Sequence, residues 1–96
     1  MPGAAGKGDT VLFEVSDFDL CLQLFERLRE HWPTYLLGRR DVRFVAVSID
    51  PDDVSMEMLL HTVSEWAGEV GMLLVPFHIG EQTSVVIAKA PESPET

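Results

Sequence analysis

The sequence predicts an α+β domain, a two-layer α/β sandwich in which two helices cover one face of an antiparallel-rich sheet. Two observations carry this prediction. Short apolar runs with the two-residue period of strands alternate with two longer runs that have a helical period. The chain has 96 residues, of which 46% are apolar, and this length and composition suit one globular domain.

The two ends of the chain differ in composition from its middle. Residues 1–9 are small and glycine-rich, and residues 91–96 (PESPET) are acidic and proline-rich. Such segments bury too little apolar surface to offset their conformational entropy. We therefore expect disorder in 1–9 and 91–96, and a single α+β domain over 10–90.

The first strand is predicted over TVLFEVS, with Val11, Phe13 and Val15 on one face. A helix is expected from Asp17 to His31, with Ser16 as its N-cap and Asp19 at the capping-box position. Pro33 ends it at Trp32. Its apolar stripe comprises Phe18, Cys21, Phe25, Leu28 and Trp32, widened by Leu22 and Leu24.

A hairpin is predicted next, with a short strand over residues 34–37, a turn at GRRD and a longer strand over residues 42–49. The alternative treats residues 33–40 as loop. The longer strand is apolar on both faces, which is typical of a central strand.

A second helix is predicted over residues 51–70, ending near Gly68 and Gly71. Its expected inner face comprises Met56, Leu59, Leu60, Val63, Ala67 and Val70. The segments MLLVPFHI and SVVIAKA then flank GEQT, which predicts a hairpin. Pro76 lacks an N–H and should lie on an edge strand or at a bulge.

The order of these elements favours one fold over another. With the short strand counted, βαββαβ is typical of the ferredoxin-like fold, here with an added C-terminal hairpin strand. Without it, βαβαββ would fit a truncated thioredoxin-like arrangement, although the chain has no Cys-x-x-Cys motif.

The aspartates around residue 50 have a structural explanation. Asp50 suits an N-cap, because it precedes Pro51 and an N-cap needs a non-helical backbone. Asp52 and Asp53 fall in the first helical turn, where the macrodipole favours carboxylates.

A metal site is the functional alternative. If the first and third strands were parallel neighbours, five carboxylates would meet at one end of the sheet, where Mg²⁺ could bind. These candidates are Asp17, Asp19, Asp50, Asp52 and Asp53. SDFDLC also resembles the Asp-x-Asp loop of haloacid dehalogenase-type phosphotransferases, but the chain has Cys21 where that loop has Thr or Val and lacks the family's other motifs. The structural explanation is favoured, so no catalytic residue, metal site or cofactor is predicted.

The remaining reactive side chains predict no chemistry. Cys21 falls on the apolar stripe and should be a buried, slowly reacting thiol. The three histidines are scattered, without helical metal-site spacing. Arg39, Arg40 and Arg43 form the one basic cluster, at a hairpin tip. The aromatic residues expected to reach the surface are Trp32, Tyr35 and Trp66.

The charge of the chain narrows the classes of partner. A net charge of −9 disfavours nucleic acid and anionic membrane. The single cysteine, the lack of an apolar span and the start MPGAAGKGD suit a cytoplasmic protein.

The strands carry apolar residues on both faces, and a two-layer fold leaves one face wet. We therefore expect a small acidic interaction or regulatory module acting through a C2 homodimer, or binding another protein. The alternative is a sensing domain for a small molecule or divalent cation at the aspartate-rich strand ends. Nothing in the sequence supports naming an enzyme activity.

Overall fold

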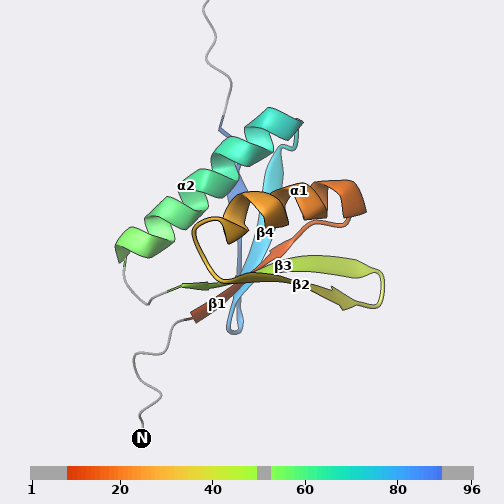
Figure 1. The fold of residues 1–96 in the computed structure, drawn as a ribbon, viewed down its shortest axis with the longest axis horizontal. Helices are drawn as coiled ribbons and strands as arrows, with labels where there is room; N and C mark the ends of the chain where they lie inside the picture. The colour runs from red at the N-terminus through yellow and green to blue at the C-terminus, as the bar shows by residue number, and fades with distance from the viewer. Residues whose placement is uncertain (1–8, 50–52, 90–96) are drawn as a thin grey trace, which may run out of the picture.

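The computed structural model describes residues 9–49 and 53–89 (Figure 1). Five strands and two helices follow one another in these ranges. They are β1 (Asp9–Glu14), α1 (Phe18–Arg29), β2 (Thr34–Arg39), β3 (Val42–Ile49), α2 (Asp53–Val70), β4 (Leu74–Ile79) and β5 (Gln82–Ile87).

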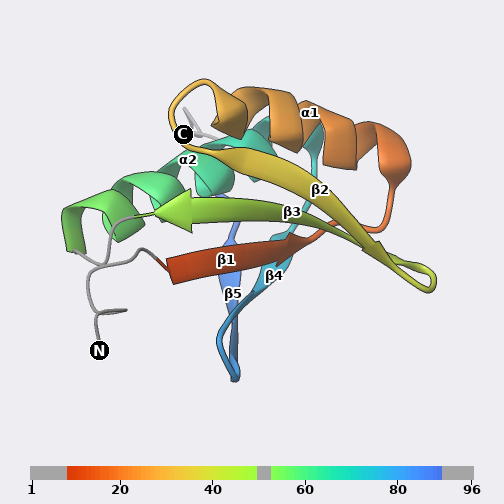
Figure 2. The same ribbon diagram turned by 60° about the horizontal axis from the view of Figure 1, so that its bottom comes forward.

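The strands form one sheet in the order β2-β3-β1-β4-β5, and each neighbouring pair is antiparallel. Both helices pack on the same face of this sheet (Figure 2). The prediction of an α+β domain with two helices on an antiparallel sheet is therefore confirmed. The ferredoxin-like assignment stays a prediction. The thioredoxin-like alternative is wrong, because residues 34–39 form a strand and β1 and β3 run antiparallel.

The core lies between the helices and the sheet. Alternate residues of the three central strands point into it, since successive side chains of a strand face opposite sides. They meet the inner faces of both helices. The buried core comprises Val11, Phe13, Val15, Cys21, Leu24, Leu28, Val45, Val47, Ile49, Leu59, Val63, Trp66, Ala67, Val75, Phe77 and Val86.

The N-terminus of α1 differs from the prediction by one residue. The N-cap is Asp17 and not Ser16, and its carboxylate accepts a hydrogen bond from the Leu20 N–H at 3.0 Å. Phe18 thus becomes the first helical residue and is half exposed, although the stripe placed it inside. The Arg43 guanidinium lies over its ring, 5.3 Å from the centroid.

The helix α2 ends at a glycine in a left-handed conformation. Gly71 has a φ of 85°, and the Met72 N–H donates to the Ala67 carbonyl at 2.9 Å. This bond is the closing bond of a Schellman motif. The helix is described from Asp53 onward, so the cap predicted at Asp50, with Pro51 and Asp52, lies outside the described residues.

Both hairpins turn through two residues. The β2–β3 turn is Arg40–Asp41, and the β4–β5 turn is Gly80–Glu81. The loop alternative for residues 33–40 is wrong, and the short strand extends to Arg39. β3 lies between two neighbours, which confirms its central position. Pro76 lies on β4, which has β1 and β5 as neighbours, so the edge strand predicted for it is wrong. The proline is tolerated there because β1 pairs only with residues 77–79 of β4.

Candidate functional site

The aspartate-rich segments do not meet at one end of the sheet. Asp9 at the start of β1 pairs with Ile49 at the end of β3. The residues that follow β1, including Asp17 and Asp19, therefore lie at the opposite end from those that follow β3. Asp50 and Asp52 lie outside the described residues, and Asp53 begins α2. The parallel pairing that the metal hypothesis required does not occur.

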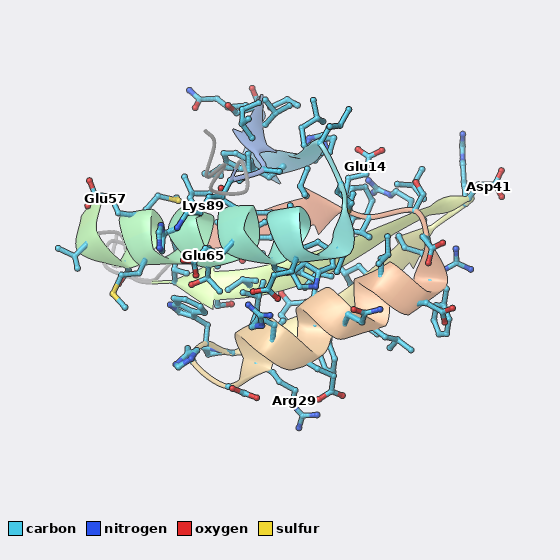
Figure 3. All side chains as sticks on the ribbon, turned by 90° about the horizontal axis from the view of Figure 1, so that it is seen from above. Glu14, Arg29, Asp41, Glu57, Glu65 and Lys89 are labelled. Carbon is cyan, nitrogen blue, oxygen red and sulfur yellow. The ribbon has the colours of Figure 1, made fainter. Side chains whose placement is uncertain are left out.

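Within residues 9–49 and 53–89, no group of three or more histidine, cysteine, aspartate or glutamate side chains is arranged to hold a metal ion. Figure 3 shows how far apart the acidic side chains lie, with Asp41 at the tip of the β2–β3 hairpin and Glu57 at the start of α2. Asp17 caps α1, so at least this candidate carboxylate has a structural role.

Cys21 lies in the core, as predicted, with 2% of its surface exposed. Burial raises the pKa of its thiol above the ordinary value, and the charge of Arg43 offsets part of that rise. A thiol held protonated in an apolar site is a poor nucleophile.

The three predicted basic residues of the hairpin tip diverge. Arg43 turns toward α1 and donates to the Ser16 carbonyl at 3.1 Å. Arg40 occupies the turn with a φ of 57°, a left-handed conformation that favours glycine. Arg39 lines a groove on the other face of the sheet.

The face of the sheet that is turned away from the helices, here called the open face, carries the most exposed apolar side chains of the strands. Its members are the strand residues that alternate with the core residues and therefore point to the other side of the sheet. They are Thr10, Leu12, Glu14, Tyr35, Leu37, Arg39, Val42, Phe44, Ala46, Ser48, Leu74, Pro76, His78, Thr83, Val85 and Ile87. No described element covers this face (Figure 2).

The apolar surface of the open face is concentrated at its two borders. On the β2 side, Tyr35 and Leu37 are exposed. On the β5 side, Leu74, Val85 and Ile87 are exposed, with Ile87 at 62%, and we call these three residues the β5 patch. A groove of about 490 Å³ lies between the borders. Its lining residues are Leu12, Leu37, Gly38, Arg39, Phe44, His78 and Gly80.

Three polar side chains in contact with one another, those of Glu14, His78 and Thr83, lie in the middle of the open face. His78 Nδ1 lies 3.1 Å from Thr83 Oγ1, and His78 Nε2 lies 3.4 Å from Glu14 Oε1. The Phe44 ring makes a T-shaped contact with the imidazole of His78, with 5.8 Å between the ring centroids. The imidazole thus bridges Thr83 on β5 and Glu14 on β1.

Sequence reasoning missed this contact because it connects three strands. The two-residue turn after Ile79 does place His78 opposite Thr83, and this pair could have been found from the hairpin spacing. The approach of Glu14 depends on the pairing of β1 with β4, for which the sequence holds no local signal.

Trp66 was expected near the surface, but it is among the most buried side chains. Its Nε1 has no hydrogen-bond partner within the described residues. It borders a second hollow of about 530 Å³ between α1 and α2. The Arg27–Glu69 ion pair joins the two helices at this hollow.

In the described part of the chain, neither helix is both long and apolar enough to cross a membrane. A comparison with known protein families found no match for the chain, and no curated protein and no solved structure matches it either.

Proposed function

We propose that this protein is a small acidic interaction module that acts as a homodimer, with another protein as the alternative partner. The observation that supports this most is the open face, where five large apolar side chains are exposed. They are Tyr35, Leu37, Leu74, Val85 and Ile87. Burial of apolar surface stabilises an association by about 25 cal/mol per Å², and exposed patches of this kind mark interaction sites.

The fold assignment belongs to the same proposal. We infer that the first four strands follow the ferredoxin-like pattern and that β5 is an addition to it. The connections support this, because α1 joins β1 to β2 across β3, and α2 joins β3 to β4 across β1. The added strand extends the open face beyond β4. A cytoplasmic location stays a prediction.

The cation-sensing alternative has lost its geometric support, since the segments after β1 and β3 lie at opposite ends of the sheet. A small molecule bound to the open face would occupy the groove beside His78. Such a ligand would compete with a protein partner on that face, and it is an outcome of the test and not a second proposal.

Light scattering after size exclusion at about 100 µM tests the proposal, since that concentration reveals micromolar association. We expect the mass of a dimer. Ile87→Glu should lower it toward that of a monomer, because the charge enters the open face. Met58→Glu is the matched control: Met58 is 58% exposed on α2, so the variant adds the same charge at similar exposure. A monomeric wild type contradicts the proposal, as does a dimer that only Met58→Glu dissociates.

A further inference from the structure

We infer that two copies of this chain pair through β5, the edge strand of the sheet, as an antiparallel ladder with a two-fold axis at Val85. This inference rests on the proposed homodimer and names its contact strand, its direction and its register. The occupant of the edge is a second copy of the chain.

Hydrogen bonds at the end of β5 show which backbone groups face outward. The Ala88 N–H donates to the Leu73 carbonyl at 3.0 Å, so residue 88 faces the β4 side. The Ile87 carbonyl accepts from Ser64 Oγ at 2.8 Å, so residue 87 faces away from β4. Backbone direction alternates along a strand, and therefore Thr83 and Val85 also face outward. No described strand lies beside β5 on that side, and α2 reaches it only at the end of the strand, where Ser64 bonds to the backbone of residues 87 and 89.

The composition of β5 is what an exposed edge normally avoids. Native proteins protect such edges with charged residues, proline or bulges. Residues 82–87 (QTSVVI) contain neither charge nor proline, in a chain with a net charge of −9. A second copy can approach this strand without bringing like charges into contact along it.

The strand is self-complementary in one register. An antiparallel ladder centred on Val85 joins the two Val85 residues and sets Thr83 opposite Ile87 of the second copy. The Ile87 carbonyl already accepts from Ser64 Oγ, so in the ladder it accepts a second hydrogen bond through its other lone pair. The same register sets Glu81 opposite Lys89 of the second copy, and the symmetry repeats this pairing at the other end. Glu81 makes no ion pair among the described residues, and Lys89 has only Glu65 at 3.6 Å. Figure 3 shows Lys89 and Glu65 side by side.

Pairing at β5 also buries apolar surface of Val85 and Ile87 that is otherwise exposed to solvent. The side chains of Val85 and Ile87 lie on the open face, and the ladder sets those of the two copies next to one another. The β5 patches of the two copies thereby become continuous across the two-fold axis.

The other edge of the sheet is a poorer candidate. The Ser48 N–H donates to the Pro33 carbonyl at 3.0 Å, so residue 33 faces β3 and the outward residues of β2 are Thr34, Leu36 and Gly38. Gly38 has no side chain to pack, and Leu36 points to the helix side of the sheet. Pairing at β2 would leave the β5 patch exposed.

A proline scan of the two edges tests the inference. Val85→Pro removes an N–H that has no strand partner within one copy, so the fold of the single chain should survive. It also removes both hydrogen bonds at the two-fold axis, and we expect the dimer dissociation constant to rise about tenfold or more. Leu36→Pro makes the same change on β2 and should leave the dissociation constant within about twofold of the wild type, and circular dichroism checks that both variants fold.

Disulfide trapping gives a result that does not depend on a destabilising variant. In a Cys21→Ser background, Val85→Cys should form a disulfide-linked dimer under mild oxidation. Residues paired across an antiparallel ladder have Cα atoms about 5.5 Å apart, which lies within the range that a disulfide spans. Leu36→Cys, also exposed on an edge strand, should form such a dimer much more slowly.

Charge reversal tests the register. At 0.15 M sodium chloride, where the repulsion between the net charges of the two copies is screened, Glu81→Lys should raise the dissociation constant by about 2- to 30-fold, since two exposed ion pairs are lost in each dimer. Adding Lys89→Glu should restore it, because each new pair is again of opposite charge. Restoration supports this register, and its absence overturns it.

The outcomes separate this inference from the proposed function. A wild-type monomer overturns both. A dimer that Val85→Pro leaves intact, with no disulfide from Val85→Cys, overturns the β5 ladder and leaves the homodimer in place. Dissociation by Leu36→Pro alone would assign the contact to β2.

Discussion

Cys21 shows how burial and charge compete at a single residue. Its side chain points from α1 into the core, where loss of solvation raises the pKa of the thiol, and the positive charge of Arg43 partly opposes this rise. Because the folded state holds the proton more tightly than the unfolded state, the thiol contributes stability that is complete below the unfolded pKa, about 8.5. That contribution is lost as the pH rises above this value.

We therefore expect the wild type to lose stability relative to Cys21→Ala in alkaline solution. The difference in free energy of unfolding between the two proteins should be constant up to about pH 8 and then fall by at most about 1.4 kcal/mol per pH unit. Urea unfolding of both proteins between pH 7 and 10 measures it. A difference that is independent of pH would show that the thiol is solvated in the native state.

Phe18 and Trp66 show where the helical pattern misplaces single residues. An apolar stripe predicts which side of a helix faces the core, but it does not predict at which residue the helix first contacts the core. With Asp17 as the N-cap, Phe18 stands at the first position and is half exposed, with Arg43 over its ring. Trp66 follows Val63 by three residues and could have been assigned to the inner face by the same spacing.

At the scale of elements, the strands and helices could be predicted more fully than their pairing. The two-residue and helical periods place all seven elements, and both hairpins follow from short turns. The direction of β1 relative to β3 could not be predicted, because it depends on contacts between residues thirty or more positions apart. The metal hypothesis for the aspartates failed at this step, because it required β1 and β3 to run parallel.

The contact between α2 and the segment after β5 depends on Gly68. A Cβ on Gly68 would lie 2.6 Å from the Lys89 carbonyl oxygen, and the Lys89 N–H donates to the Ser64 carbonyl at 3.1 Å. The predicted helix end at Val70 is confirmed, so Gly68 lies inside the last turn of the helix and not beyond it. The glycine is needed where another backbone approaches the helix.

Gly68→Ala should therefore destabilise the protein even though alanine is the better helix former. The propensity gain is about 1 kcal/mol, whereas displacing a packed backbone costs about 1–3 kcal/mol. We expect a net loss of about 1 kcal/mol in urea unfolding, since the second effect is the larger. Gly38→Ala is the control, because a Cβ there meets nothing within 4 Å. A more stable Gly68→Ala protein would show that residues 88–89 yield without cost.

At the scale of the whole molecule, net charge opposes the proposed dimer. Two copies of charge −9, taken as point charges about 30 Å apart in water, repel by about 11 kcal/mol without screening. Screening reduces this to about 4 kcal/mol at 0.01 M salt, where the Debye length is about 30 Å, and to a few tenths of a kcal/mol at 0.15 M. The two Glu81–Lys89 pairs contribute only about 0.4–2 kcal/mol in total. Repulsion therefore exceeds the ion pairs at low salt.

The dimer should accordingly tighten as salt is added, although its interface contains ion pairs. We expect the dissociation constant to fall at least about tenfold between 0.01 M and 0.15 M sodium chloride. Sedimentation equilibrium over a dilution series at each salt concentration measures it. Sucrose in place of salt, at equal osmolality, controls for effects that are not electrostatic. A dissociation constant that rises with salt would mean that attractive charge pairs dominate the contact, and an interface centred on the uncharged β5 strand would then be ruled out.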